Sequence, residues 1–160
     1  MKRQIAIWVT IAALVSMGLS ACSSSSDGLP SASTVTVSEW IVQPKPAEVK
    51  NGQVKITADN VGSEEHELLV FRGSKADLPL KPNGSVDEDA AEANIVGEIS
   101  GIAAGSTKSK TFDLELVGEY TIFCNIEHEA VTGMDDGSDT DYVSHYKNGM
   151  VASLTVSAKN

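Results

Sequence analysis

The chain has few basic residues. Its 12 lysines and arginines stand against 22 aspartates and glutamates, and the formal net charge is −10 at pH 7. A surface with this balance repels nucleic acid and anionic lipid, because binding to phosphate groups depends on Lys and Arg. The charge therefore argues against nucleic acid as a partner. The acidic charge suits a basic protein partner, and it also serves solubility.

Long apolar runs are equally scarce, and the clearest one opens the chain. Two basic residues precede a nearly uncharged run at 5–19, which is too short and too early for a membrane span. The run ends in the sequence LSAC at 19–22, which resembles the lipobox of bacterial lipoproteins. The resemblance implies a signal peptide at 1–21, cleavage before Cys22 and lipid on its sulfur. A plain signal peptide or an uncleaved anchor is the alternative, and export follows in either case.

The mature protein is then expected on the outer side of the cytoplasmic membrane or in the periplasm or cell envelope. Its N-terminal lipid would be its only contact with the membrane. Residues 22–33 are rich in Ser, with Gly and Pro, and predict a flexible tether without regular structure. Residues 34–160 have the length of one ordinary domain. Loss of the signal peptide leaves ten basic residues against 22 acidic ones, a net charge of −12.

Cysteine is scarce as well, because the chain contains only Cys22 and Cys124. With lipid on Cys22, an intramolecular disulfide is excluded, and Cys124 is a lone thiol in an oxidising compartment. It can be an inert buried residue, half of an intermolecular bridge, a nucleophile or a metal ligand. A cysteine hydrolase needs an exposed thiol beside a histidine and an orienting group, whereas Cys124 follows the apolar run at 120–123.

The rest of the pattern predicts an all-β protein. Short runs rich in β-branched and apolar residues alternate with Gly, Asn and Pro turn signals, and such strands favour a sandwich. The least regular internal segment, 75–94, predicts a short helix or an irregular insertion. The expected strands are 34–41, 53–58, 66–72, 111–116, 118–124 and 151–156.

Four residues in this pattern match the ligand types of a copper site that transfers electrons. Such a site serves both Cu(I) and Cu(II) by combining two imidazoles, one thiolate and a weak axial thioether. The chain offers His66, Cys124, His145 and Met150. Zinc fits less well because it rarely takes a thioether ligand. A binuclear copper centre needs a second thiolate, which the mature chain lacks.

The segments that carry these residues resemble the cupredoxins, the blue copper proteins. The resemblance covers the whole mature domain, and it implies a Greek-key β-sandwich with one type 1 copper ion. It also implies electron transfer rather than catalysis, binding through Nδ1 of both histidines, and an apolar surface through which electrons leave. The matching segments are SEW at 38–40, NVGSEEHELLV at 60–70, GEYTIFCN at 118–125 and HYKNGMVASLTV at 145–156.

The long segment between Cys and the second His contains a competing pair, His128 and Met134. The common family pattern has the ligand His soon after the Cys. We favour His145 and Met150, because Met134 is followed by a polar run that does not begin a buried strand. Met150 instead leads directly into the alternating strand at 151–156.

The same segment is acidic, and it would lie next to the electron exit. We expect it either to dock a basic redox partner, such as a cytochrome or an oxidase domain, or to be a solvated loop without a partner. Its acidic residues are Glu127, Glu129, Asp135, Asp136, Asp139 and Asp141.

Two functions are compatible with the sequence: an electron carrier, and a copper-binding module that stores or hands over the metal without a dedicated redox partner. A storage or transfer module often carries extra Met or His clusters. This chain has three histidines and four methionines, of which Met1 and Met17 lie in the signal peptide. The sequence therefore favours the electron carrier.

Overall fold

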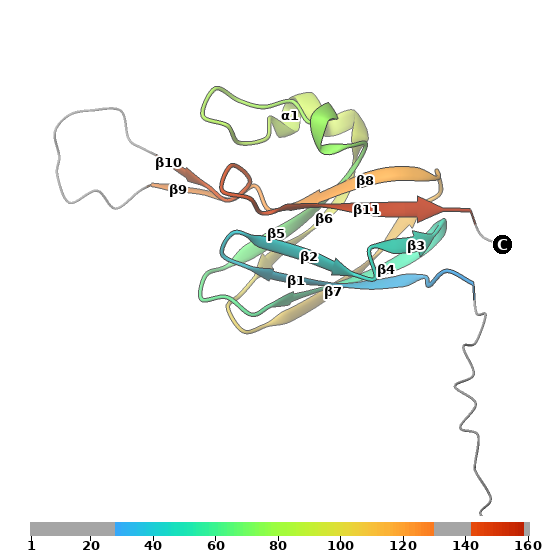
Figure 1. The fold of residues 1–160 in the computed structure, drawn as a ribbon. Helices are drawn as coiled ribbons and strands as arrows, with labels where there is room; N and C mark the ends of the chain where they lie inside the picture. Colours follow the sequence, from blue (N-terminus) through green and yellow to red (C-terminus); the bar gives the residue numbers. More distant parts are fainter. Residues whose placement is uncertain (1–27, 130–141, 159–160) are drawn as a thin grey trace, which may run out of the picture.

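A computed structural model of the chain describes residues 28–129 and 142–158 (Figure 1). Two β-sheets pack face to face. One has the strand order β2-β1-β4-β7 and the other the order β3-β11-β8-β5-β6. The strands of the first sheet are β1 Ala32–Ser38, β2 Ile41–Lys45, β4 Gly52–Asn60 and β7 Thr107–Leu114. Those of the second are β3 Glu48–Lys50, β5 His66–Arg72, β6 Ile95–Ile102, β8 Gly118–Phe123 and β11 Val151–Ser157.

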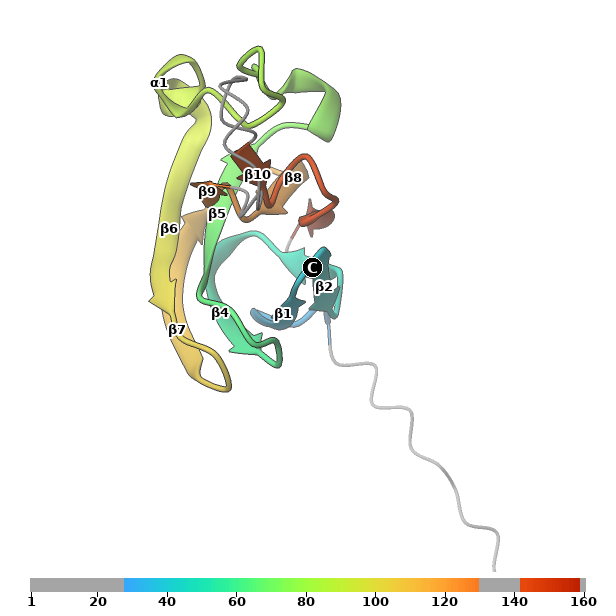
Figure 2. The ribbon, with the colours of Figure 1, turned by 90° about the vertical axis from the view of Figure 1, so that its left-hand side faces the viewer.

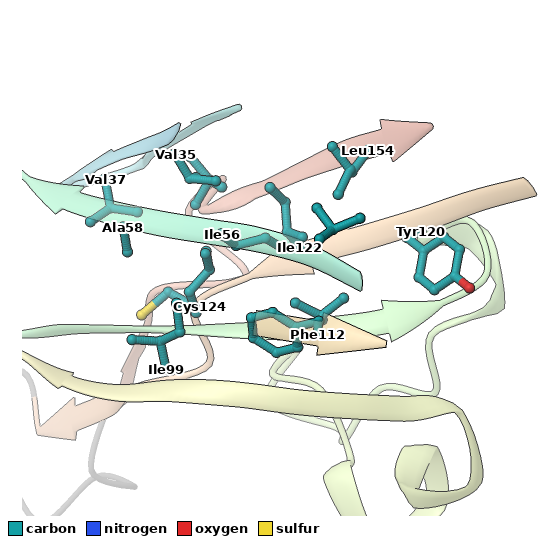
Figure 3. Close-up of a cluster of buried hydrophobic side chains, with 14 of the residues drawn as sticks. Val35, Val37, Ile56, Ala58, Ile99, Phe112, Tyr120, Ile122, Cys124 and Leu154 are labelled. Atoms are coloured by element: carbon teal, nitrogen blue, oxygen red, sulfur yellow. The ribbon is translucent and has the colours of Figure 1, made fainter. Parts of the chain in front are cut away.

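Alternating side chains from both sheets form the main core. In β4, for example, Val54, Ile56 and Ala58 are fully buried while their neighbours face outward. Figure 3 shows this cluster, in which Cys124 lies beside aliphatic and aromatic side chains. Burial of each Val, Leu or Ile side chain contributes roughly 1.5–3 kcal/mol, so the cluster holds the sheets together. The metal-binding candidate Cys124 is thus part of the core.

Strand β5 is buried on both faces, which explains its unbroken apolar sequence. Leu68 and Val70 enter the main core, whereas Leu69 and Phe71 form a second cluster on the other side of the sheet. This cluster is covered by the segment between β5 and β6, which holds two 3-10 turns, η1 Lys75–Asp77 and η2 Glu92–Asn94, and the helix α1 Glu88–Ala91. The predicted β-sandwich, with a short helix at 75–94, is confirmed.

The start of the domain differs from the expectation in two respects. The strand predicted at 34–41 is a hairpin, because Trp40 takes a positive φ of 67° and turns the chain between β1 and β2. In addition, β1 begins at Ala32, and Ser33 is buried, so the end of the predicted tether belongs to the sheet. The predicted signal peptide at 1–21 and Cys22 lie outside the described residues. Within the described part of the chain, no helix is long and apolar enough to cross a membrane.

The two ends of the segment between Cys124 and His145 pair with each other as short strands. Its strands are β9 Glu127–Glu129 and β10 Tyr142–Ser144, which pair antiparallel. Met134 and the acidic residues at 135–141 lie outside the described residues. Figure 1 places β9 and β10 at the same end of the sandwich as the β1–β2 turn. Figure 2, seen from that end, shows them in front of β5 and β8.

Candidate metal centre

Three of the four predicted ligands meet in a buried cluster at this end of the sandwich. His66 and Cys124 are fully buried, and His145 is 1% exposed. The Nδ1 atoms of the two histidines lie 3.2 Å apart, and Cys124 Sγ lies 3.4 Å from His145 Nδ1 and 4.0 Å from His66 Nδ1. Two imidazole nitrogens and one sulfur thus converge on one point, with one ligand atom of each residue within 4.8 Å of the others.

The turn before β5 positions His66. The buried side chain of Asn60 accepts a hydrogen bond from the Gly62 amide and donates to the carbonyls of Glu64 and Ile102. These bonds fix both ends of the turn and tie it to β6. A histidine at the first position of β5 is therefore held on rigid backbone, as a metal ligand requires.

The carboxylate of Glu39, in the β1–β2 turn, also holds the turn before β5. Glu39 Oε1 accepts hydrogen bonds from the amides of Ser63 and Glu64 and from the Ser63 hydroxyl. Hydrogen bonds from backbone amides lower the pKa of Glu39 to about 2; the amide of Glu39 itself contributes most, followed by that of Ser63. Glu39 is therefore ionised at neutral pH, and its Oε1 lies 4.0 Å from His66 Nε2.

Backbone hydrogen bonds join the other three predicted ligands. The Cys124 amide donates to the Met150 carbonyl, the Met150 amide to the His145 carbonyl, and the His145 amide to the Ile126 carbonyl, each over 3.0 Å. Met150 is fully buried in the same core cluster as Cys124. The chain thus returns from the β9–β10 hairpin to the end of β8 and brings His145 and Met150 back beside Cys124.

Asn125 connects this loop to the segment that carries α1. Its side chain accepts from the Val86 amide and donates to the Val86 carbonyl and to the Glu88 carboxylate. The residue is 6% exposed, so these bonds are sheltered from water. The residue after Cys124 is therefore anchored to a second part of the fold.

Burial governs the protonation of the cluster. It is the main cause that lowers the pKa of both His66 and His145, and for His145 the neighbouring His66 and His128 lower it further. Both imidazoles are then neutral and hold a lone pair for a metal. Burial also raises the pKa of the Cys124 thiol to about 11. A metal bound to this sulfur must displace its proton.

The outer edges of the two imidazoles are buried but form no hydrogen bond within the described part of the chain. His145 Nε2 lies 3.5 Å from Glu64 Oε2, beyond good hydrogen-bond geometry. Two further rings meet His145 edge to face: Trp40 at 5.6 Å and His128 at 5.2 Å between centroids. The His145 ring therefore lies between the buried cluster and side chains that reach the surface.

The competing residue His128 lies next to the cluster but outside it. It stands on β9, opposite Val143, and its side chain is exposed. It meets His145 in a separate group with Glu64, whose carboxylate lies 3.5 Å from His145 Nε2. Met134, the other competitor, lies outside the described residues. The choice of His145 and Met150 as ligands stays a prediction, which the placement of His145 favours.

Comparisons with known proteins rest on structure alone, because no family model and no curated protein sequence matches the chain. The dithionite-reduced auracyanin of Roseiflexus castenholzii is 20% identical, covers 81% of this chain and 99% of its own, and has a TM-score of 0.54. The fold is that of the cupredoxins. Auracyanin B is 17% identical over 79% of this chain and 88% of its own, with a TM-score of 0.51. Auracyanin A of Chloroflexus aurantiacus, a blue copper protein, is 18% identical over 79% of this chain and 99% of its own, with a TM-score of 0.46.

The donor set of this cupredoxin fold suits copper on chemical grounds. Two neutral imidazoles and one buried sulfur converge, and no carboxylate of the described residues forms part of that cluster. Soft sulfur with imidazole favours copper over magnesium, calcium or manganese, which prefer oxygen ligands.

The sequence did not reveal the residues that support this cluster. Glu39, Asn60 and Asn125 act through hydrogen bonds to segments far away in the chain. The only local signal was the Asn60-Val61-Gly62 turn, which predicts a bend but no bond to Ile102. Trp40 is exposed by 43% and gave no signal that it would contact His145.

Proposed function

We propose that this protein is an electron carrier that holds one copper ion in a type 1 site. The ligands would be His66, Cys124 and His145, with Met150 as the weak axial ligand. The observation that carries the proposal is the buried convergence of the two Nδ1 atoms and the Cys124 sulfur in a cupredoxin fold. Copper bound there supplies one-electron chemistry between Cu(I) and Cu(II).

The surrounding residues suit such a carrier because they limit rearrangement and exclude water. His66 begins a strand, Cys124 follows directly after one, and both are fully buried. The Asn60 side chain donates to the Ile102 carbonyl and the Asn125 side chain accepts from the Val86 amide, and these hydrogen bonds hold the backbone next to the ligands. A rigid, dry ligand set gives both oxidation states the same geometry, and this keeps the cost of reorganisation low.

Electrons would leave through the edge of His145. Its ring contacts Trp40 and His128, both exposed, whereas His66 and Cys124 are enclosed by the core. Trp40 is 43% exposed and its neighbour Ile41 is 49% exposed, so an apolar patch lies beside this exit. Such a patch suits a brief contact with a redox protein.

The partner would be a redox protein with a basic face, such as a cytochrome or an oxidase domain, because the chain carries a large excess of acidic residues. Glu127, however, is already paired with Lys81 at 3.4 Å and with Asn83 at 3.0 Å. It therefore contributes less to docking than its sequence position suggests. The resemblance of residues 19–22 to a lipobox supports export and a lipid tether at Cys22, with the domain outside the cytoplasmic membrane.

A redox titration of the purified, copper-loaded protein tests the proposal. The intense absorption of the thiolate–Cu(II) bond should disappear on reduction and return on oxidation, with a midpoint that fits one electron and without loss of copper. A basic cytochrome should then exchange electrons at a rate that falls with added salt. Copper that leaves the protein on each cycle would contradict the carrier and favour storage or transfer.

A further inference from the structure

A second group of metal-ligand side chains lies directly outside the buried cluster. It consists of Glu64, His128 and His145, and one ligand atom of each lies within 4.8 Å of the other two. His145 belongs to both groups. Its Nδ1 faces Cys124 at 3.4 Å, whereas its Nε2 lies 3.5 Å from the Glu64 carboxylate. The same imidazole therefore has one nitrogen on each side.

His145 Nε2, the nitrogen that faces away from Cys124, has no hydrogen-bond partner among the described residues. His145 is 1% exposed, and its Nε2 is buried without a hydrogen-bond partner. A buried ring nitrogen without a hydrogen-bond partner is energetically unfavourable, because it has lost its hydrogen bonds to water. A side chain that is held in this way, with a carboxylate and a second imidazole in front of it, points to a ligand at that position.

Two separate parts of the fold fix the residues that face this nitrogen. Glu64 belongs to the turn before β5, where its amide donates to Glu39 and its carbonyl accepts from Asn60. His128 stands on β9 in register with Val143 of β10. Both side chains are exposed, in contrast to the buried ligands behind them.

We propose that Glu64, His128 and His145 form an outer copper-binding site that captures Cu(II) from solution and passes it to the buried site. The inference rests on the proposed copper function of the buried cluster. One carboxylate oxygen and two imidazole nitrogens are a suitable donor set for Cu(II). The carboxylate also attracts a cation toward the only ligand that the two sites share.

Because both sites use the His145 imidazole, copper can occupy them only one after the other. A neutral imidazole has a lone pair on one nitrogen only, so His145 binds metal at Nε2 or at Nδ1 but not at both. In the transfer, the bonds of Cu(II) to Glu64, His128 and Nε2 break, and bonds to Nδ1, His66 and the Cys124 sulfur form. The copper stays Cu(II), the proton of Nδ1 moves to Nε2 through solvent, and the thiol proton is released to water.

The test measures how fast copper enters the metal-free protein. Cu(II) is mixed with purified apoprotein, and the thiolate–Cu(II) absorption is followed in time. His128→Ala and Glu64→Gln should load about tenfold or more slowly than wild type, as expected when a metal site loses a ligand, and both should reach the same final spectrum. Glu65→Gln is the matched control, because Glu65 is the exposed neighbour outside the cluster, and it should load at the wild-type rate.

A second measurement separates this inference from the proposed function. Zn²⁺ is titrated calorimetrically into metal-free Cys124→Ala, in which the buried site lacks its thiolate, with and without His128→Ala. The outer site predicts that His128→Ala weakens Zn²⁺ binding about tenfold or more. Wild-type protein that turns blue, with equal loading rates in all variants and unchanged Zn²⁺ affinity, overturns the outer site alone. Protein that never turns blue, but loses Zn²⁺ affinity with His128→Ala, overturns the carrier instead.

Discussion

The Cys124 amide donates a hydrogen bond to the Met150 carbonyl over 3.0 Å. This bond continues the pairing of β8 with β11, in which Val151 stands opposite Phe123. The thiol and the thioether are therefore placed by neighbouring strand ends, although the β9–β10 hairpin separates them in the sequence.

Replacement of Met150 by Leu removes the sulfur while keeping the volume nearly constant. We expect the free energy of unfolding to fall by less than about 1.5 kcal/mol, as for other volume-conserving core substitutions. The copper should stay bound and strongly coloured, but its reduction potential should rise, because the weak axial donor stabilises Cu(II). Voltammetry and denaturant unfolding measure the two effects. A potential equal to that of wild type would show that Met150 is not a ligand.

Substitution of His145 and of His128 should have opposite effects on the blue absorption. His145→Ala removes Nδ1 from the buried cluster and should abolish the blue absorption at any copper concentration near stoichiometry. His128→Ala should show the wild-type absorption once loading is complete, because His128 does not belong to the group formed by His66, Cys124 and His145. If His128→Ala loses the colour and His145→Ala keeps it, the ligand assignment is wrong.

Asn60→Ala tests the support of the turn before His66. The substitution leaves the buried carbonyl of Ile102 and the ends of the turn without their partners. We expect a loss of roughly 2–4 kcal/mol in the free energy of unfolding. Asn94→Ala is the control, because its side chain accepts one exposed hydrogen bond from Arg72 and should cost less than about 0.5 kcal/mol. Equal losses in the two variants would contradict the structural role of Asn60.

The sequence predicted the sandwich because strands such as β1 and β4 alternate clearly and β5 forms a compact apolar run. Strand β6, in contrast, was not predicted: its apolar positions are interrupted by Gly97 and Gly101, and its pairing with β5 contains register shifts. The short strands β9 and β10 were missed because three residues give no periodicity. The turn at Trp40 was missed because a tryptophan with positive φ has no sequence signal.

The ligand candidates followed from residue type and position, since soft sulfur and imidazole are rare in this chain. The residues around these ligands could not be predicted from the sequence. The bonds of Glu39 to the turn at 63–64, and the approach of Glu64 and His128 to His145, join residues from different strands. Only the three-dimensional arrangement shows that Glu64 and His128 also meet the His145 ring, because no local sequence pattern encodes contacts between distant segments.

Cys22→Ala tests the lipid tether. If the sequence at 19–22 is a lipobox, the wild-type protein should be found in the membrane fraction and carry a diacylglycerol mass on its N-terminal residue. The variant should lose that mass and either leave the membrane fraction or keep its uncleaved leader. Mass spectrometry of both forms decides the matter. Wild-type protein that begins at Cys22 without added lipid would contradict the tether.

The visible absorption spectrum of the Cu(II)-loaded protein, recorded beside that of Cys124→Ser, tests the central claim most directly. The oxygen of serine replaces the sulfur in the same buried position and removes the thiolate donor. We predict an intense band toward the red end of the visible spectrum for wild type, with one copper per chain, and no such band for Cys124→Ser. Wild-type protein that binds copper without this band, or a variant that retains it, would contradict the type 1 site.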